Sequence, residues 1–448
     1  MCILISFPIY NIMAISPFEE RYATEMNKVF DEETKMKKWL AVEVALAKAH
    51  AKIGNFGKDA AKKIEEGSIK VKIERVKEIE KEIDHDLMAL VKALSEQSGE
   101  AGKYVHLGST SYDIEDTATA LIFRDAIELI EKDAQNLLQV LRDLANTHKK
   151  TICIGRTHGQ HAVPTTYGMK FALYYQETKR NLDRLKDAKK GILVGKMSGA
   201  VGTKATFQGK GSAIEMEVMK SLDLTPAKVT NQVIQRDRHA EVLCSLAIFS
   251  ALFEKIAKEI RNLQRNEILE VSEYFSPTQV GSSTMPQKRN PHKSERICSI
   301  ARLVRANVQT AIENIALEHE RDLTNSANER AIFSESFIAT HYILLQTTKI
   351  LSGLEFFPEN IKQNLELTQG LVMSERVMIA LTNKGMARQD AHELVRQLAQ
   401  EAFRSGRDLK YVVKEKTKHF TNTELNELFD YSTYIGEAEK IVEEAVND

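Results

Sequence analysis

Gly281-Ser282-Ser283-Thr284-Met285-Pro286-Gln287-Lys288-Arg289-Asn290-Pro291 is the stretch around which this chain is organised. It lies between two long helical patterns, and its glycine, two adjacent serines and two prolines prevent regular secondary structure. Glycine permits a tight turn whose N–H groups can face an anion, while Lys288 and Arg289 add positive charge and Asn290 adds an amide. These residues predict a mobile lid that closes over an anionic substrate. Composition alone fits an ordinary basic surface loop equally well.

The order of residues in this stretch, however, resembles that of a known family. GSSTMPQKRNP is similar to the signature of the fumarase/aspartase superfamily, whose members cleave C–N or C–O bonds and release fumarate. The resemblance implies an all-α, three-domain fold with a central bundle of long helices, which forms a homotetramer with a core of twenty helices. It also implies that Ser282 is the general base. Ser283, the fallback base, is expected beside it in the substrate site.

Composition restricts the remaining possibilities. Of the 448 residues, 43% are hydrophobic and 28% charged, which is ordinary for a globular protein, and the formal net charge is −1. A chain so close to neutral gives no electrostatic reason to bind nucleic acid, so any anion site must be local. The cysteines show no C-x-x-C pair, which favours reduced thiols in the cytoplasm over disulfides or zinc; they are Cys2, Cys153, Cys244 and Cys298.

The first dozen residues are apolar but lack a basic region and are too short to cross a bilayer. We therefore expect no membrane association. Residues 1–12 are interpreted as a dispensable extension, with Met13 as a plausible start. A signal peptide is the minor alternative.

Helical periodicity dominates the chain, which has only 8 prolines. Long helices are predicted over residues 32–52, 117–148, 164–189, 297–318 and 328–352. Val242–Phe253 has no charged residue and is apolar on nearly every face, so such a helix must be surrounded by others. We expect an N-terminal helical domain (1–110), a central bundle that carries the signature (111–361) and a C-terminal helical domain (362–448).

Within the superfamily the resemblance is closest to the adenylosuccinate lyases, and it covers nearly the whole chain. These enzymes remove fumarate from adenylosuccinate, giving AMP, and from the succinylated carboxamide ribotide of purine synthesis. The resemblance implies a carbon–nitrogen lyase that acts on a nucleotide without metal or organic cofactor. It also implies active sites built from three chains of the tetramer.

Several N-terminal motifs match this family. Arg21-Tyr22 could be a solvated arm, but the family uses such a pair on the nucleotide phosphate. In Asp84-His85-Asp86 the flanking carboxylates favour the imidazolium form of the histidine, as in many paired surface histidines. The family places an active-site histidine here, in a motif commonly written Arg-His-Asp. Asp84 stands where that arginine is usual, which leaves the neighbouring substrate contact open.

A turn from His106 to Asp113 opens the next helix, where hydroxyl and acidic residues cap the helix and complement its dipole. Capping explains these residues without a ligand. The resemblance adds that Thr110 and Ser111 bind a substrate carboxylate and that His106 lines the site. Both interpretations can hold, because helix N-termini bind anions.

Gly155-Arg156-Thr157-His158-Gly159-Gln160-His161 contains two histidines three residues apart, but no carboxylate or cysteine accompanies them to form a metal site. A capped histidine at the start of a helix is the simple alternative. In the family, the histidine after Arg-Thr is the proton donor, which here is His158. Glu295, in the helix after the signature, is expected to orient that imidazole.

The remaining substrate contacts follow from the resemblance. Gln232 matches a glutamine that contacts the substrate, and a phosphate clamp is expected at Arg321, Ser326 and Arg330. Without the resemblance, these residues fit a helix linker with ion pairs. A carbon acid beside a carboxylate is very weak, so Lys288, Asn290 and the loop amides are expected to stabilise the dianion. The alternatives are a carboxymuconate cycloisomerase-like or other superfamily lyase, or a non-catalytic structural protein on this fold.

Overall fold

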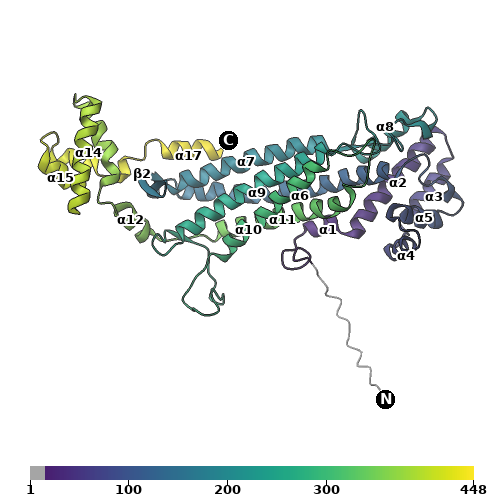
Figure 1. Ribbon diagram of the computed structural model, residues 1–448, viewed down its shortest axis with the longest axis horizontal. Coiled ribbons are helices and arrows are strands. Elements are labelled where there is room, and N and C mark those ends of the chain that lie inside the picture. The colour runs from purple at the N-terminus through teal and green to yellow at the C-terminus, as the bar shows by residue number, and fades with distance from the viewer. Residues whose placement is uncertain (1–15, 448) are drawn as a thin grey trace, which may run out of the picture. The chain divides into compact units, whose positions relative to one another are not determined.

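The computed structural model describes residues 16–447, so the proposed extension at residues 1–12 lies outside the part described. Helices α1 to α17 make up most of the described chain (Figure 1). Three two-stranded sheets accompany them, β1–β2, β3–β4 and β5–β6. The all-α class predicted from the sequence is confirmed. Within residues 16–447 no helix is both long and apolar enough to span a membrane.

The chain divides into two compact units. Of the described residues, unit 1 comprises 16–133, 181–251 and 299–345, and unit 2 comprises 134–180, 252–298 and 346–447. Five long helices each have residues in both units: α6 (Ser111–Thr147), α7 (Tyr167–Ile192), α9 (Asp237–Leu263), α10 (His292–Glu313) and α11 (Ser326–Ser352). The sequence predicted all five. The three-domain division stays a prediction.

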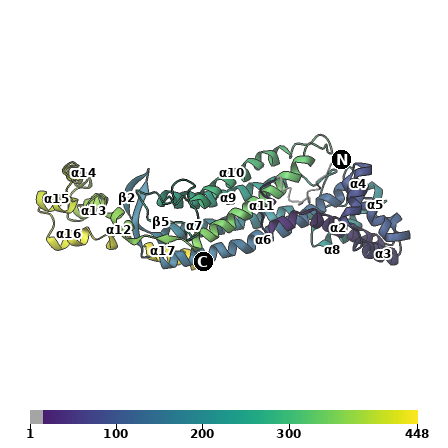
Figure 2. The ribbon, with the colours of Figure 1, turned by 90° about the horizontal axis from the view of Figure 1, so that it is seen from below.

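Unit 1 contains an N-terminal group of helices. Its longest member begins where the Asp31 side chain accepts a hydrogen bond from the Thr34 N–H and ends at Gly54, whose φ of 83° closes the helix. Helices α2, α3, α5 and α8 lie together (Figure 2), and their shared core includes Leu46, Leu90 and Val218. Apart from the five long helices, the elements of unit 1 are α1 (Met26–Phe30), α2 (Glu32–Ile53), α3 (Lys58–Ser68), α4 (Ile73–Ile83), α5 (Asp86–Ser98), η1 (Gly99–Tyr104), β3 (Val194–Gly195), η2 (Ala205–Phe207), α8 (Gly211–Leu222) and β4 (Thr225–Pro226).

Unit 2 contains a separate C-terminal helical group with its own core, which includes Val377, Val395 and Val412 (Figure 1). Apart from the five long helices, the elements of unit 2 are β1 (Ile152–Thr157), β2 (Gln160–Thr166), β5 (Val271–Ser272), β6 (Glu355–Phe356), α12 (Pro358–Glu366), η3 (Leu371–Met373), α13 (Ser374–Asn383), α14 (Arg388–Ser405), α15 (Leu409–Lys416), α16 (Asn422–Leu428), η4 (Tyr431–Thr433) and α17 (Ala438–Asn447).

One helix prediction was wrong at its start. Helix α7 does not begin at Pro164; that residue lies in β2, opposite Ile154 of β1. β-Branched residues are frequent in this segment and favour strand. A register shift between Ile154 and Arg156 interrupts the ladder next to the proline, which has no N–H to donate. The result is a hairpin instead of a helix start.

The apolar stretch Val242–Phe253 lies within α9, as predicted. Most of it is buried, but Cys244, Ile248 and Ala251 keep some exposure, and the Ile248 side chain is 49% exposed. These residues are four and three positions apart and therefore lie on one face of the helix. A single chain thus leaves an apolar stripe uncovered.

Candidate functional site

Unit 1 holds a cavity of about 190 Å³, here called the Tyr112 cavity. Two members of the expected phosphate clamp line it, Ser326 and Arg330, together with Asp86 of the histidine motif. The first turns of α6 supply Tyr112, Glu115 and Asp116, and the other lining residues are Phe30, Glu32, Lys35, Trp39, Thr119, Ile122, Phe123, Arg236, Glu329, Phe333 and Ser334. Segments far apart in the sequence therefore meet here.

Arg321, the third member of the clamp, stacks on Tyr112. Its guanidinium carbon lies 3.5 Å from the ring centroid, and its Nη1 donates to Gln232 Oε1 at 3.0 Å. The Tyr112 hydroxyl lies 3.5 Å from Ser326 Oγ. Arg321 Nε and Nη2 are buried, yet within the described chain they have no hydrogen-bond acceptor. Two buried guanidinium nitrogens without an acceptor in the described chain indicate a place for an anion.

Asp86 is held firmly in the same region. Its carboxylate accepts from the Leu87 N–H at 2.8 Å and from Arg330 Nη2 at 2.7 Å. Burial by itself would raise the pKa of Asp86, but the hydrogen bond and charge of Arg330 outweigh burial and lower the pKa. The preceding residues are more open: His85 is an exposed N-cap whose Nδ1 accepts weakly from the Met88 N–H at 3.4 Å, and Asp84 is exposed at the left-handed end of α4.

His106 is partly buried and contacts a buried carboxylate that the sequence did not single out. Its Nδ1 donates to Glu43 Oε1 at 2.6 Å, and its backbone N–H lies 3.2 Å from Glu43 Oε2. Burial would lower the pKa of His106, but the Glu43 carboxylate raises it overall. Glu43 interrupts the apolar face of α2. This charged residue on an apolar face was the only feature of the sequence that pointed to a buried partner for it.

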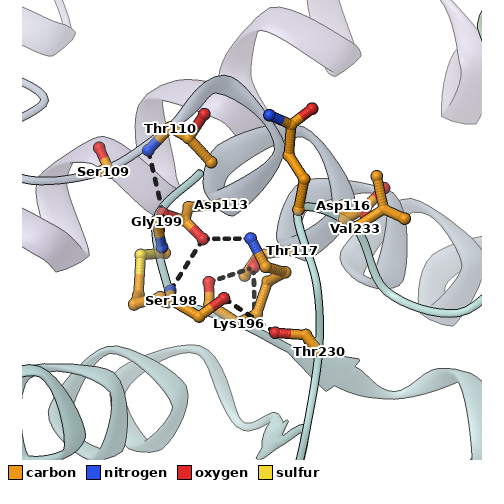
Figure 3. A network of polar contacts seen from close by, with 12 residues as sticks. Ser109, Thr110, Asp113, Asp116, Thr117, Lys196, Ser198, Gly199, Thr230 and Val233 are labelled. Carbon is orange, nitrogen blue, oxygen red and sulfur yellow. Dashed lines mark hydrogen bonds and ion pairs between the residues drawn. The ribbon is translucent and has the colours of Figure 1, made fainter. Parts of the chain in front are cut away.

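The N-terminus of α6 is fixed by a buried network (Figure 3). Asp113 accepts from the ammonium of Lys196 and from the N–H groups of Thr110, Ser198 and Gly199, the last three at 2.9–3.0 Å. Lys196 and Asp113 are fully buried. This network fixes the backbone at Thr110, at the start of α6, through the Asp113 carboxylate.

The Arg21-Tyr22 pair does not reach the Tyr112 cavity in this chain. Arg21 is exposed, and Tyr22 packs on Tyr342 with ring centroids 5.1 Å apart. Neither lines the cavity. Their expected contact with phosphate stays a prediction.

In unit 2, His158 forms the tip of the β1–β2 hairpin. His158 and Gly159 are its two turn residues and have φ values of 54° and 73°. Paired positive φ values are typical of a tight two-residue hairpin turn and explain the glycine. The imidazole is exposed at the tip.

The base of the hairpin is anchored by Glu270, which is fully buried. Its carboxylate accepts from Arg156 Nη2 at 2.5 Å, from the Tyr167 hydroxyl at 2.5 Å and from Asn364 Nδ2 at 3.0 Å. These bonds fix Arg156, two residues before His158. Only the charge at a buried position between Leu269 and Val271 could have revealed Glu270 in the sequence.

The signature loop, residues 281–291, forms no helix or strand. Ser282 Oγ accepts from the N–H groups of Thr284 at 3.3 Å and Met285 at 3.0 Å. Asn290 Nδ2 donates to the Gly281 carbonyl at 2.9 Å and closes the loop at its base. A Cβ at Gly281 would lie 2.1 Å from the Lys288 carbonyl oxygen, so this turn requires glycine.

The charged groups of the loop are open to solvent. Lys288 and Arg289 are exposed and line a large cavity of about 1020 Å³ in unit 2, together with Asn290 and Glu295. Ser283 is also exposed. Within residues 16–447, no hydrogen bond or ion pair joins Glu295 to His158, so the expected orientation of the imidazole stays a prediction.

Other residues around the Tyr112 cavity were missed as well. Arg236 bridges Asp116 and Glu329 with bonds of 2.7–3.2 Å, and all three are buried. Tyr112 was visible only as part of a capping turn. In the described part of the chain, no three His, Cys, Asp or Glu side chains are grouped to hold a metal ion.

Comparison with known proteins identifies the family of this chain. A family model described as "Lyase" matches residues 19–306, and one described as "Adenylosuccinate lyase C-terminus" matches residues 370–445. The chain is 55% identical to the adenylosuccinate lyase of Pyrococcus abyssi (strain GE5 / Orsay), over 97% of this chain and 98% of the relative. It is 54% identical to that of Pyrococcus horikoshii (strain ATCC 700860 / DSM 12428 / JCM 9974 / NBRC 100139 / OT-3), with the same coverage.

Among solved structures, the 3-carboxy-cis,cis-muconate lactonizing enzyme from Pseudomonas putida is similar with a TM-score of 0.88 and 32% identity, over 96% of this chain and 98% of that one. That likeness confirms the superfamily fold. The C-terminal family model and the curated relatives identify the branch. The chain belongs to the adenylosuccinate lyase family of the fumarase/aspartase superfamily.

Proposed function

We propose that this protein eliminates fumarate from adenylosuccinate, giving AMP, and from the succinylated aminoimidazole carboxamide ribotide. Arg321 is the observation that carries the proposal beyond family membership. Among residues 16–447, two of its buried guanidinium nitrogens find no acceptor, and the guanidinium stacks on Tyr112, which lines the cavity. A nucleotide phosphate offers the oxygens that these donors lack. Arg330 lines the same cavity and adds a second cation, and Gln232 holds Arg321 in place.

The chemical step is assigned to unit 2. Ser282 removes the proton next to the succinyl β-carboxylate, and His158 protonates the departing nitrogen. Serine is a weak base, so its alkoxide needs stabilisation. The two N–H groups directed at Ser282 Oγ support this role. Histidine titrates near neutrality and can hold a proton and release it at pH 7.

Lys288 and Asn290 then stabilise the dianion as charge develops on the carboxylate. Glu295 orients the imidazole of His158. His85 and His106 are the other two histidines that line the active site. Thr110 and Ser111 bind a substrate carboxylate at the N-terminus of α6, where N–H groups favour anions. Closure of the signature loop excludes water from the intermediate.

We further propose that the working enzyme is a homotetramer with active sites shared between subunits. The uncovered stripe of α9, formed by Cys244, Ile248 and Ala251, supports an assembly that surrounds this helix. An enzyme of this kind would act in the cytoplasm. The free thiols of Cys153, Cys244 and Cys298 are compatible with such a reducing compartment.

The direct test is an absorbance assay that follows the loss of adenylosuccinate by purified protein. Rapid loss with equal production of AMP and fumarate is expected. Lack of turnover in a folded, tetrameric protein would favour the non-catalytic alternative. A parallel assay with a carboxymuconate substrate tests the cycloisomerase alternative, for which no turnover is expected.

A further inference from the structure

Glu115 differs from the other carboxylates of the Tyr112 cavity. Each of the other four lining carboxylates has a cationic partner: Glu32 pairs with Lys35, Asp86 with Arg330, and Asp116 and Glu329 both pair with Arg236. Within the described chain, the Glu115 carboxylate has neither a hydrogen bond nor an ion pair. It is partly buried and lines the cavity together with Arg330 and Ser326.

The charges that face Glu115 come from every element around the cavity. The acidic groups are Glu32, Asp86, Asp116 and Glu329, the cationic groups are Lys35, Arg236, Arg321 and Arg330, and Tyr112 adds a phenol. The four cations balance the other four carboxylates. An ionised Glu115 would therefore leave an excess negative charge where the phosphate is proposed to bind. A neutral Glu115 removes that excess.

The surroundings of Glu115 stabilise its neutral form relative to that of a carboxyl group in water. Burial is the largest influence and raises the pKa of Glu115; Asp86 and Asp116 raise it further, Arg321 and Arg330 oppose them, and the result is about 7. A phosphate dianion bound to the two arginines adds another negative charge and raises this pKa again. Once protonated, the carboxyl group gains an O–H donor for an anionic ligand.

We propose that Glu115 is a specificity-determining residue that takes up a proton when a phosphorylated nucleotide binds in the Tyr112 cavity. This inference rests on the proposed function, because it requires the phosphate to bind beside Arg321 and Arg330. Proton uptake makes affinity for the phosphorylated ligand depend on pH. Near pH 7 about half of the Glu115 carboxyl groups are protonated before the ligand binds. As pH rises from 7 toward the pKa of the complex, affinity falls by up to about tenfold per pH unit.

The test is calorimetric titration with AMP at pH 8, in two buffers of different ionisation enthalpy. At this pH AMP is already a dianion, so proton exchange reports the protein. The wild type is expected to take up a substantial fraction of one proton with AMP and almost none with adenosine. Its affinity for AMP should fall several-fold from pH 7 to 8.5, whereas affinity for adenosine should stay level.

Two variants complete the design. Glu115→Gln imitates the neutral carboxyl and should bind AMP without the extra proton, with a flat pH profile. Glu32→Gln alters a paired carboxylate of the same cavity and should keep the proton uptake of the wild type. Equal uptake by wild type and Glu115→Gln would overturn the assignment to Glu115. Absence of uptake by the wild type would overturn it even if that variant failed to fold.

The proposed function fails separately. If AMP does not bind, or binds equally well to Arg321→Ala, then the phosphate does not occupy this cavity. If AMP binding depends on Arg321 but wild-type proton uptake is absent, only the role of Glu115 is wrong.

Discussion

The two regions that carry the predicted site residues are built differently. Around the Tyr112 cavity in unit 1, most charged side chains are paired, and the Arg236 bridge between Asp116 and Glu329 is buried, although Glu32 and Arg330 at the same cavity are exposed. In unit 2, His158 and Lys288 are exposed, at a hairpin tip and on a loop. The residues proposed to bind the phosphate thus lie in a packed cavity of one chain, whereas the residues proposed for the chemical step lie on open surface that another subunit would have to complete. Substitutions around the Tyr112 cavity should therefore change ligand affinity, whereas substitutions at His158 and Ser282 should change turnover.

The largest effect is expected from the exposed groups. His158→Ala and Ser282→Ala should each lower turnover by about 10²–10⁴-fold, because each removes a proton-transfer group. Melting temperature should hardly change, since neither side chain is buried. The measurement is turnover and thermal melting on the same preparations. Near wild-type turnover of a folded His158→Ala protein would show that His158 is not the proton donor.

Mixing the two inactive variants tests whether another chain completes the site. After the His158→Ala and Ser282→Ala proteins are dissociated, mixed in equal amounts and reassembled, roughly a quarter of the sites should contain both groups. Activity should return to about that fraction of the wild type. A reassembled sample of each variant alone is the control. Mixed tetramers as inactive as their parents would contradict shared sites.

Removing an arginine tests the binding region. Arg321→Ala should weaken AMP by about 10- to 100-fold, because a hydrogen bond to a charged group contributes about 1.5–3 kcal/mol. Adenosine, which lacks the phosphate, should bind almost as before. Equal losses for both ligands would place the phosphate elsewhere.

Two lysines that look similar in the sequence sharpen the contrast. Lys196→Met leaves Asp113 without its buried cationic partner and should lower the free energy of unfolding by about 3–5 kcal/mol. Lys288→Met, on the exposed loop, should leave stability unchanged and lower turnover. Denaturant unfolding at one protein concentration compares them. Equal stabilities would mean that the Asp113 network does not need its ammonium group.

The smallest effect concerns His106. Its folded-state pKa is raised by Glu43, so the stabilisation is fully present below pH 6.5 and is lost as pH rises through the folded-state pKa. Wild-type stability should therefore fall relative to Glu43→Gln as pH increases from 6 to 8. Parallel unfolding curves across this range would show that the pair does not titrate as described.

The sequence predicted the long helices well because their apolar periodicity is local. It failed at Pro164, where hairpin pairing overrode a strong helix-start signal. The resemblance assigned a phosphate clamp to Arg321, Ser326 and Arg330; the last two line one cavity, and their role in binding phosphate stays a prediction. Periodicity could not pair Glu43 with His106 or Glu270 with Arg156, because partners 63 and 114 positions apart meet only through tertiary packing. In both cases the only signal in the sequence was a glutamate, Glu43 or Glu270, within an otherwise apolar pattern.

The division of the chain into two units also has a consequence for its synthesis. The chain passes between units five times, each time within a long helix, and unit 1 receives its last segment only at residues 299–345. A growing chain cannot complete unit 1 until about three quarters of it has left the ribosome. Until then, the apolar stretch Val242–Phe253 of α9 lacks part of its packing. Folding of this protein is therefore concentrated late in translation, when exposed apolar helices make protection by chaperones most valuable.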